Sequence, residues 1–342
     1  MPEIGITSTV PVEVLLAASA QPVDLNNIFI SDPQPERLIR NAERHGFPLN
    51  ACTWIKGIFS VALEYKIDAV LGVTSGDCSN TLMLMEVLEL HGVKTTPFAY
   101  PCSPDAGAMA RALRELAARF GTSLDAAEKV RQELQSCREA LAELDRLTWQ
   151  ENKASGFENH YWLVSASDFN RDPGRFCADA RDTVATMRQR EPYPADMLRL
   201  AFTGVPAVYG RELYAFLESK GARVVFNEVQ RQFAMINSAG SLAAQYAGYT
   251  YPYATSMRIA DIAAECGRRR IDGIIHYVQA FCHRAIGDIV FRRNLKYPIL
   301  TLEGSTEFSL SQHTKTRLEA FLDMLQQHKN NNKEALWQPE SA

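Results

Sequence analysis

Three cysteines occupy positions in this sequence where a thiolate could bind a metal. Cys78 lies in "TSGDCSNT" (74–81), between the apolar run "DAVLGV" and the apolar run "LMLMEVL", which together predict a strand-to-helix turn. Cys282, in "HYVQAFCHRAIGD", has the same placement, and Cys52 stands at the start of a predicted helix with Asn50 as a possible cap. At a helix N-terminus the backbone N–H groups and the dipole favour an anion, which lowers the pKa of a thiol.

A single cysteine is most often just a small buried residue, so the argument depends on the three placements being alike. The other four cysteines are weaker candidates. Cys137 lies on the apolar stripe of a helix, Cys266 is near a helix C-terminus and Cys177 is in the middle of a predicted helix. Cys102 follows a predicted strand and is the plausible fourth site residue.

The spacing of the three favoured cysteines favours an iron–sulfur cluster over a structural zinc site. No CxxC pair occurs in the sequence, whereas structural zinc sites usually have four ligands in locally paired positions. Three thiolates on a four-iron cluster leave one iron open to water, a hydroxyl group or a substrate.

Strands and helices alternate at both ends of the chain. Apolar strands such as "AVLGVTS" and "GIIHYV" are each followed by an amphipathic helix, which indicates parallel sheets covered on both faces. The predicted fold class is therefore α/β, with two Rossmann-like domains, a helical segment joining them, and the cluster site between them. The predicted boundaries are an N-terminal domain at 1–103, a helical connector at 104–195, a C-terminal domain at 196–328, and a loose tail at 329–342.

Composition excludes several classes of function. The net charge of the 342-residue chain is −4 and no basic patch stands out, so we expect no nucleic-acid partner. The N-terminus lacks the basic start of a signal peptide, and no apolar window reaches the roughly 18 residues of a membrane span. We expect a cytoplasmic protein with reduced cysteines and no membrane contact.

The sequence resembles the 2-hydroxyacyl-CoA dehydratase family, the D-component group that also contains benzoyl-CoA reductase subunits and double-cubane cluster proteins. The order and spacing of several stretches carry the resemblance: "TSTVPVEVLLAASAQPVDLNN" (7–27), "CTWIKGIFSVAL" (52–63), "TSGDCSNT", "TGVPAVYGRELYAFLESKGARVVFNE" (203–228), "DGIIHYVQAFC" (272–282) and "YPILTLEGSTEFSLSQHTKTRLEAFLDML" (297–325).

The resemblance implies that Cys52, Cys78 and Cys282 hold a [4Fe-4S] cluster and that the substrate is a coenzyme A thioester. It also implies a paralogous subunit, or a second copy of this chain, and a separate ATP-dependent activator that delivers a low-potential electron. In the dehydratases that electron forms a ketyl radical from the thioester carbonyl, so that a β-proton can leave with the hydroxyl group. In the reductases the electrons enter an aromatic ring.

Two alternatives stay open. One is a double-cubane-type reductase of small molecules with an [8Fe-9S] cofactor, to which Cys102 could contribute. The other is an electron-transfer subunit without a substrate site of its own. The chain contains neither GxGxxG nor GxxxxGK[ST], so any ATP is expected to bind another polypeptide.

Several polar residues accompany the cysteines. His283 and Arg284 could stabilise a thioester oxygen or cluster sulfide, or simply begin an exposed helix. Ser75 and Ser79 could donate hydrogen bonds to cluster sulfur, and Asp77 could bind there or cap the turn. Glu13, in an apolar helix, has either a catalytic or a capping role.

Overall fold

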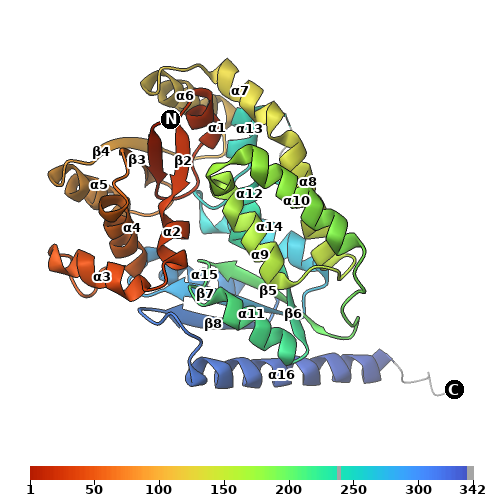
Figure 1. Cartoon of the computed structure of the whole chain (residues 1–342). Helices are drawn as coiled ribbons and strands as arrows, with labels where there is room; N and C mark the ends of the chain where they lie inside the picture. Colours follow the sequence, from red (N-terminus) through yellow and green to blue (C-terminus); the bar gives the residue numbers. More distant parts are fainter. Residues whose placement is uncertain (237–239, 337–342) are drawn as a thin grey trace.

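The structure is a computed structural model that describes residues 1–236 and 240–336 of the chain. It contains two four-stranded parallel sheets with helices packed around and between them (Figure 1). The expected α/β class with two Rossmann-like sheets is therefore confirmed. In both sheets the strands lie side by side in the same spatial order: the second strand of that sheet in the sequence, then the first, the third and the fourth. The chain therefore adds strands on one side of the first strand and then on the other, and this reversal of the strand order falls between the first and third strands.

The first sheet is built from the N-terminal residues. Its strands are, in spatial order, β2 (Gln21–Asp24), β1 (Glu3–Ile6), β3 (Ala69–Ser75) and β4 (Lys94–Ala99). β2 was not expected from the sequence, because Pro22 weakens a strand prediction. The structure places β2 at the sheet edge, where a residue without an N–H is tolerated.

Helices cover both faces of this sheet because alternate strand residues point to opposite sides. Val70 packs in an apolar cluster with the helices of one face, while its neighbour Leu71 packs in a second cluster on the other face. The helices of this part are α1 (Val12–Ala17), α2 (Leu25–Ser31), α3 (Pro35–Arg44), α4 (Thr53–Glu64) and α5 (Asn80–Leu90).

A helical segment joins the two sheets, as the sequence predicts. It consists of α6 (Ala106–Arg119), α7 (Leu124–Glu133), α8 (Gln135–Trp149), α9 (Gly156–Val164), the 3₁₀ turns η1 (Ser165–Ser167) and η2 (Phe169–Arg171), and α10 (Pro173–Arg188). Within the predicted helical connector (104–195), α10 starts only at Pro173, because residues 169–171 have positive φ.

The second sheet repeats the topology of the first. Its strands are, in spatial order, β6 (Ala222–Asn227), β5 (Leu198–Gly204), β7 (Gly273–Gln279) and β8 (Ile299–Gly304). The helical elements of this half are α11 (Gly210–Ser219), α12 (Glu228–Ala234), α13 (Leu242–Ala247), α14 (Thr255–Arg269), η3 (His283–Gly287), α15 (Asp288–Asn294) and α16 (Gln312–Leu336).

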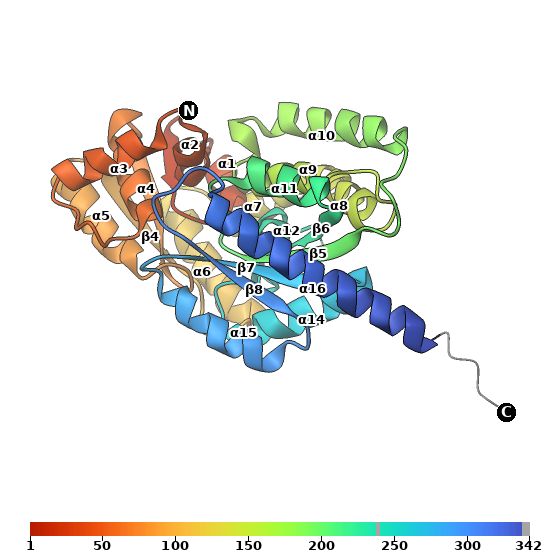
Figure 2. The ribbon, with the colours of Figure 1, turned by 90° about the horizontal axis from the view of Figure 1, so that it is seen from below.

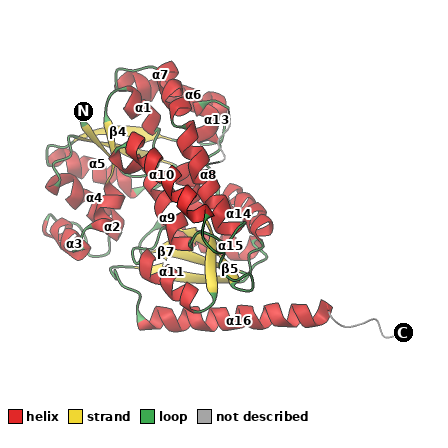
Figure 3. Ribbon diagram, turned by 45° about the vertical axis from the view of Figure 1, so that its right-hand side comes forward, coloured by secondary structure: helices red, strands yellow, loops and turns green. Residues whose placement is uncertain are grey.

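The last helix differs from the expected loose tail. α16 continues to Leu336, so residues 329–336 are helical, and the rest of the predicted tail (337–342) lies outside the described residues. Leu318, Phe321 and Leu325 fix the first part of α16 against the second sheet. Figure 2 and Figure 3 show α16 running along that sheet and extending past the body of the molecule.

One short helix crosses from the second half of the chain to the first. α13 packs against α6, and Leu242 and Tyr246 belong to the same apolar cluster as Ile6 of β1 (Figure 1). The predicted C-terminal domain range of 196–328 therefore includes a segment that belongs structurally to the first sheet.

Candidate functional site

A cavity of about 120 Å³ lies where the carboxyl ends of both sheets meet. Residues 7–9 follow β1, residues 77–78 follow β3, residues 205–206 follow β5, and residues 279–284 end or follow β7; all of these segments contribute to its lining. In open parallel sheets, ligands bind beyond the carboxyl ends of the strands where the strand order reverses. Here the two reversal points face one common cavity.

The three favoured cysteines all line this cavity. Cys52 is the residue before α4, Cys78 lies two residues before α5, and Cys282 is the residue before η3. Cys52 and Cys78 come from the first sheet region and Cys282 from the second. The geometry therefore brings together three thiols that are far apart in the sequence.

Backbone N–H groups lie near each thiol, as the positions at helix starts predict. The N–H groups of Trp54 and Ile55 act to lower the pKa of Cys52, and that of Asn80 acts to lower the pKa of Cys78. The N–H groups of residues 284 and 285 act in the same way on the pKa of Cys282, although among the described residues neither Cys52 nor Cys282 forms a side-chain capping hydrogen bond. Such donors stabilise sulfur that carries negative charge, either as a thiolate or as a metal ligand.

The net pKa shift is nevertheless opposite to the sequence-based expectation. Burial raises the pKa of Cys52 and of Cys282, and it raises the pKa of Cys78 to about 12, with the charge of Asp77 adding to the effect. The prediction of lowered thiol pKa values is therefore wrong for these three cysteines, because loss of solvent outweighs the effect of the N–H groups. A bound cation would supply the missing positive charge.

Two polar contacts connect the two sheet regions beside the cysteines. Gln279 Nε2 donates to Thr53 Oγ1 over 3.0 Å, and Thr53 is the neighbour of Cys52. Arg284 donates to the carbonyl oxygens of Gly76 and Tyr251, and its guanidinium lies 4.1 Å from the centre of the Tyr251 ring. Both contacts hold segments that carry cysteines in fixed positions across the cavity.

Gly76 is required at its place in the turn that carries Cys78. Its φ of +96° is in the region that favours glycine, and a Cβ there would lie 2.6 Å from the Cβ of Pro252. The backbone at Gly76 can thus approach both Pro252 and the Arg284 side chain.

Comparison with known families identifies the group to which the chain belongs. The model of the family described as 2-hydroxyglutaryl-CoA dehydratase, D-component, matches residues 7–325. The chain belongs to this family. The match covers every strand except β1, the helical segment and all three cavity cysteines, so a role as a dehydratase-like enzyme component follows. No curated protein matches the chain.

The polar candidates of this D-component chain divide into two groups. Asp77, His283 and Arg284 line the cavity, and burial together with the Arg284 charge lowers the pKa of His283. Ser75 and Ser79 are exposed and are not part of the cavity lining; Ser79 instead lines an adjacent polar pocket together with His283 and Arg284.

Glu13 lies outside the cavity lining, and its carboxylate has a structural role. It is fully buried and forms an ion pair with Arg138 at 2.6 Å. Gln245 Nε2 and the Tyr246 hydroxyl also donate to it. Because α1, α8 and α13 all contribute to this network, Glu13 joins the first sheet to the helices that pack on it, and we do not retain it as a catalytic candidate.

The remaining cysteines do not line the cavity. Cys102 is exposed in the loop after β4, whereas Cys137 and Cys266 are fully buried, as expected for core residues. Cys177 is partly buried and contacts Cys137 between α10 and α8. Within residues 1–236 and 240–336, no three His, Cys, Asp or Glu side chains are grouped closely enough for one metal ion.

Sequence reasoning missed several residues of the cavity wall. Thr9, Asp24, Trp54 and Gln279 line the cavity, and Thr9 Oγ1, Trp54 Nε1 and Gln279 Oε1 are buried without a hydrogen-bond partner among the residues that the structure describes. The available signal was the position of Thr9 after β1 and of Asp24 at the end of β2, but β2 had not been recognised.

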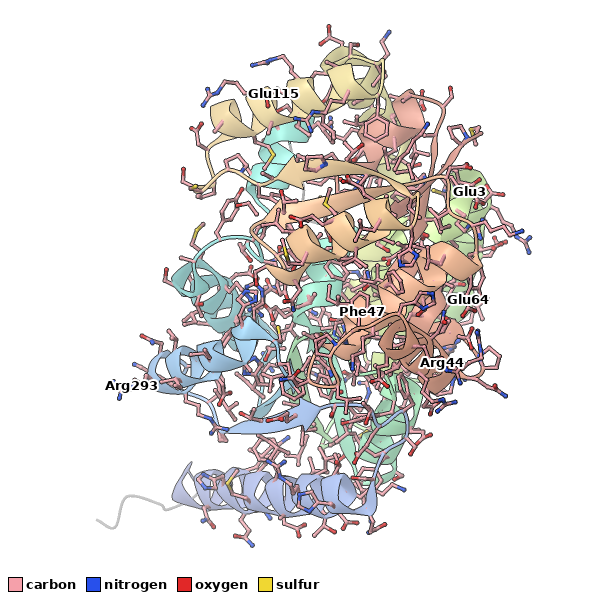
Figure 4. All side chains as sticks on the ribbon, turned by 90° about the vertical axis from the view of Figure 1, so that its left-hand side faces the viewer. Glu3, Arg44, Phe47, Glu64, Glu115 and Arg293 are labelled. Atoms are coloured by element: carbon pink, nitrogen blue, oxygen red, sulfur yellow. The ribbon has the colours of Figure 1, made fainter. Side chains whose placement is uncertain are left out.

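One outer side of the molecule is shared by elements of both halves. Figure 4 shows this side, with Phe47 from the loop before α4 and Arg293 from α15. Among the helices that the structure describes, none is long and apolar enough to cross a membrane.

Proposed function

We propose that this chain is the iron–sulfur subunit of a 2-hydroxyacyl-CoA dehydratase-like or benzoyl-CoA reductase-like enzyme. Cys52, Cys78 and Cys282 hold a [4Fe-4S] cluster, and a coenzyme A thioester places its acyl group in the adjoining cavity. The chain then acts as a lyase or an oxidoreductase together with its partners in the cytoplasm.

One observation carries this proposal: three thiols from three separate helix starts line a single cavity between two sheets. They are not grouped for a single ion within the described residues, whereas a four-iron cluster is several ångströms across and suits more widely separated thiols. Backbone N–H groups beside each sulfur fit the donor pattern around cluster thiolates.

When bound, the cluster supplies one-electron chemistry and, at an iron without a thiolate ligand, a Lewis acid. The residues of the chain have complementary tasks. The guanidinium of Arg284 brings positive charge to the cysteine side of the cavity, where a thioester oxygen that gains negative charge is stabilised. His283 and Asp77 lie on the same side and are the nearest candidates to hold or release a proton there.

Two partners belong to the proposal. An ATP-dependent activator protein supplies the low-potential electron, since the chain has no phosphate-loop motif of its own. A paralogous subunit, or a second copy of this chain, completes the enzyme. An electron-transfer subunit without its own substrate site remains the second candidate, and binding of a coenzyme A ester to this chain decides between the two.

The test is anaerobic purification and reconstitution, followed by iron and sulfide counting and electron paramagnetic resonance. We expect about four iron and four sulfide per chain. About eight iron per chain would favour the double-cubane [8Fe-9S] alternative, although the described part of the chain brings only three cysteines to the cavity. A chain that stays free of iron would contradict the proposal.

A further inference from the structure

The cavity wall that carries no cysteine has a distinct composition. It is formed by residues 7–9 after β1, by Asp24 at the end of β2, and by the side chains of α2, α9, η1 and α12. Its apolar contributions are Ile30, Trp54, Ile58, Val164, Val229 and Phe233, where Trp54 and Ile58 come from the adjoining α4. Its polar contributions are Thr7, Ser8, Thr9, Asp24, Asn26, Asn27 and Ser167, but most of the surface that faces the cavity is apolar, so an acyl chain in the cavity meets mainly hydrocarbon.

The charges in the cavity are distributed unevenly. Among the described residues that line it, the guanidinium of Arg284 is the only permanent cation, and it lies beside Cys282 in the sequence and is bound to the Gly76 carbonyl next to Asp77. The wall without cysteines has no Lys, Arg or His among its described residues, and its one ionisable side chain is Asp24.

Asp24 is held as a hydrogen-bond acceptor. Its side chain accepts from the backbone N–H groups of Asn26 and Asn27, from Asn26 Nδ2 at 3.0 Å and from the Ser167 hydroxyl at 2.6 Å. These contacts use both carboxylate oxygens as acceptors, so Asp24 has no free donor to offer a ligand. It also places negative charge against the wall.

A second carboxylate on the acyl group would be poorly accommodated at this wall. Moving an ionised carboxylate out of water is costly unless a cation or several donors replace the solvent, and a like charge nearby raises that cost. The unpartnered hydroxyl of Thr9 can hydrogen-bond a neutral polar group, but it does not neutralise a full charge.

We propose that the cavity selects coenzyme A esters with an uncharged, mainly apolar acyl group and discriminates against acyl groups that carry a second carboxylate. This inference rests on the proposed function. It separates the substrate class of this chain from the 2-hydroxyglutaryl group in the description of its family.

The experiment is isothermal titration of the cluster-reconstituted full-length chain under inert gas at pH 7.5. The ligands are two esters with an uncharged acyl group, 5-methyl-2-hydroxyhexanoyl-CoA and benzoyl-CoA, and 2-hydroxyglutaryl-CoA, whose acyl group carries one free carboxylate in place of an isopropyl group of similar size. Free coenzyme A gives the baseline. We expect at least one ester with an uncharged acyl group to bind about tenfold or more tightly than 2-hydroxyglutaryl-CoA, which corresponds to about 1.4 kcal/mol.

An Asp24→Asn variant tests the contribution of the wall charge. Asparagine also caps helices well, so the start of α2 is preserved. The ratio of the dissociation constants of 2-hydroxyglutaryl-CoA and the ester with an uncharged acyl group should fall by roughly threefold or more, because the like charge at the wall is removed. Asp105→Asn is the matched control, because Asp105 also caps a helix, α6, but is exposed and outside the cavity lining. The Asp105→Asn chain should show the same preference among the esters as the wild type.

The outcomes separate the inference from the proposed function. Equal or tighter binding of 2-hydroxyglutaryl-CoA would overturn the inference and leave the proposed function in place. If no ester binds better than free coenzyme A, although the chain holds its cluster, the proposed substrate site and the inference both fail.

Discussion

The side-chain amide of Gln279 donates a hydrogen bond to the hydroxyl of Thr53 over 3.0 Å, and this contact joins the two sheet regions at the cavity. Gln279 ends β7, three residues before Cys282, while Thr53 begins α4 directly after Cys52. The Thr53 hydroxyl in turn donates to the Ser305 carbonyl oxygen at 3.2 Å, after β8. The contact thus fixes the distance between two of the three thiols.

We expect Thr53 and Gln279 to be energetically coupled. Thr53→Val and Gln279→Leu keep approximate shape but remove the hydrogen bond, and each should lower the free energy of unfolding by about 1 kcal/mol or more, since both groups are buried. In a double-mutant cycle by urea unfolding, the coupling should be about 0.5–1.5 kcal/mol. Strict additivity of the two effects would show that the contact does not exist in solution.

Glu13 should prove to be a stability residue. Glu13→Gln leaves the fully buried Arg138 without its counter-ion, and the loss of one partner of a buried pair costs about 3–5 kcal/mol of unfolding free energy. Chemical denaturation measures this loss. The matched control is Glu36→Gln in the first turn of α3, where the side chain is exposed and the change should be within about 0.5 kcal/mol. A Glu13→Gln chain of unchanged stability would contradict the structural role.

Asp168 should contribute a pH dependence of stability. Burial, together with the negative charge of Asp24, raises the pKa of Asp168 from 3.8 to about 7. Between pH 3.8 and about 7, the folded chain therefore binds more protons than the unfolded chain. The contribution of protonated Asp168 to the free energy of unfolding is present at low pH, decreases as the pH rises toward 7, and is absent above it.

The measurement compares wild type with Asp168→Asn by urea unfolding at several pH values between 5 and 8. Asparagine retains one acceptor oxygen, so it keeps one of the two hydrogen bonds that Asp168 accepts, from the N–H of Asp24 at Oδ2 or from that of Asn170 at Oδ1; the loss of the other lowers stability by an amount that does not depend on pH. The stability advantage of the wild type should shrink with rising pH, by at most about 1.4 kcal/mol per pH unit for one proton. The difference in unfolding free energy between the two proteins removes the contribution of groups that titrate alike in both. His160 is one such group, and burial lowers its pKa to about 4. A difference that does not change with pH would refute the assignment.

Much of the fold could be predicted from the sequence because apolar patterning is local. The strands around Val70 and Ile274 are continuous apolar runs, and the structure buries both residues completely. β2 was missed because "QPVD" is short and contains Pro22, and its place at the sheet edge depends on pairing with β1 rather than on its own sequence. The position of α13 beside the first sheet likewise depends on its packing against α6 and not on its own sequence pattern.

For the site, sequence reasoning singled out three cysteines that line one cavity, but it misjudged their surroundings. The rule that a helix start lowers a thiol pKa considers only local N–H groups, whereas burial around Cys78 comes from distant segments and has the larger effect. Glu13 showed the same difficulty. A carboxylate in an apolar helix can be catalytic or paired, and its partners Arg138 and Tyr246 are more than a hundred residues away.

The central claim is that Cys52, Cys78 and Cys282 together hold one four-iron cluster. The most direct test counts iron and sulfide after anaerobic reconstitution of the wild type, of three single Cys→Ser variants at these positions, and of Cys102→Ser. Cys102 is exposed and outside the cavity lining, so its variant is the matched control. We predict about four iron per chain in the wild type and the control, and a large loss in each of the other three. Full iron content in any of those three variants, or no iron in the wild type, would contradict the claim.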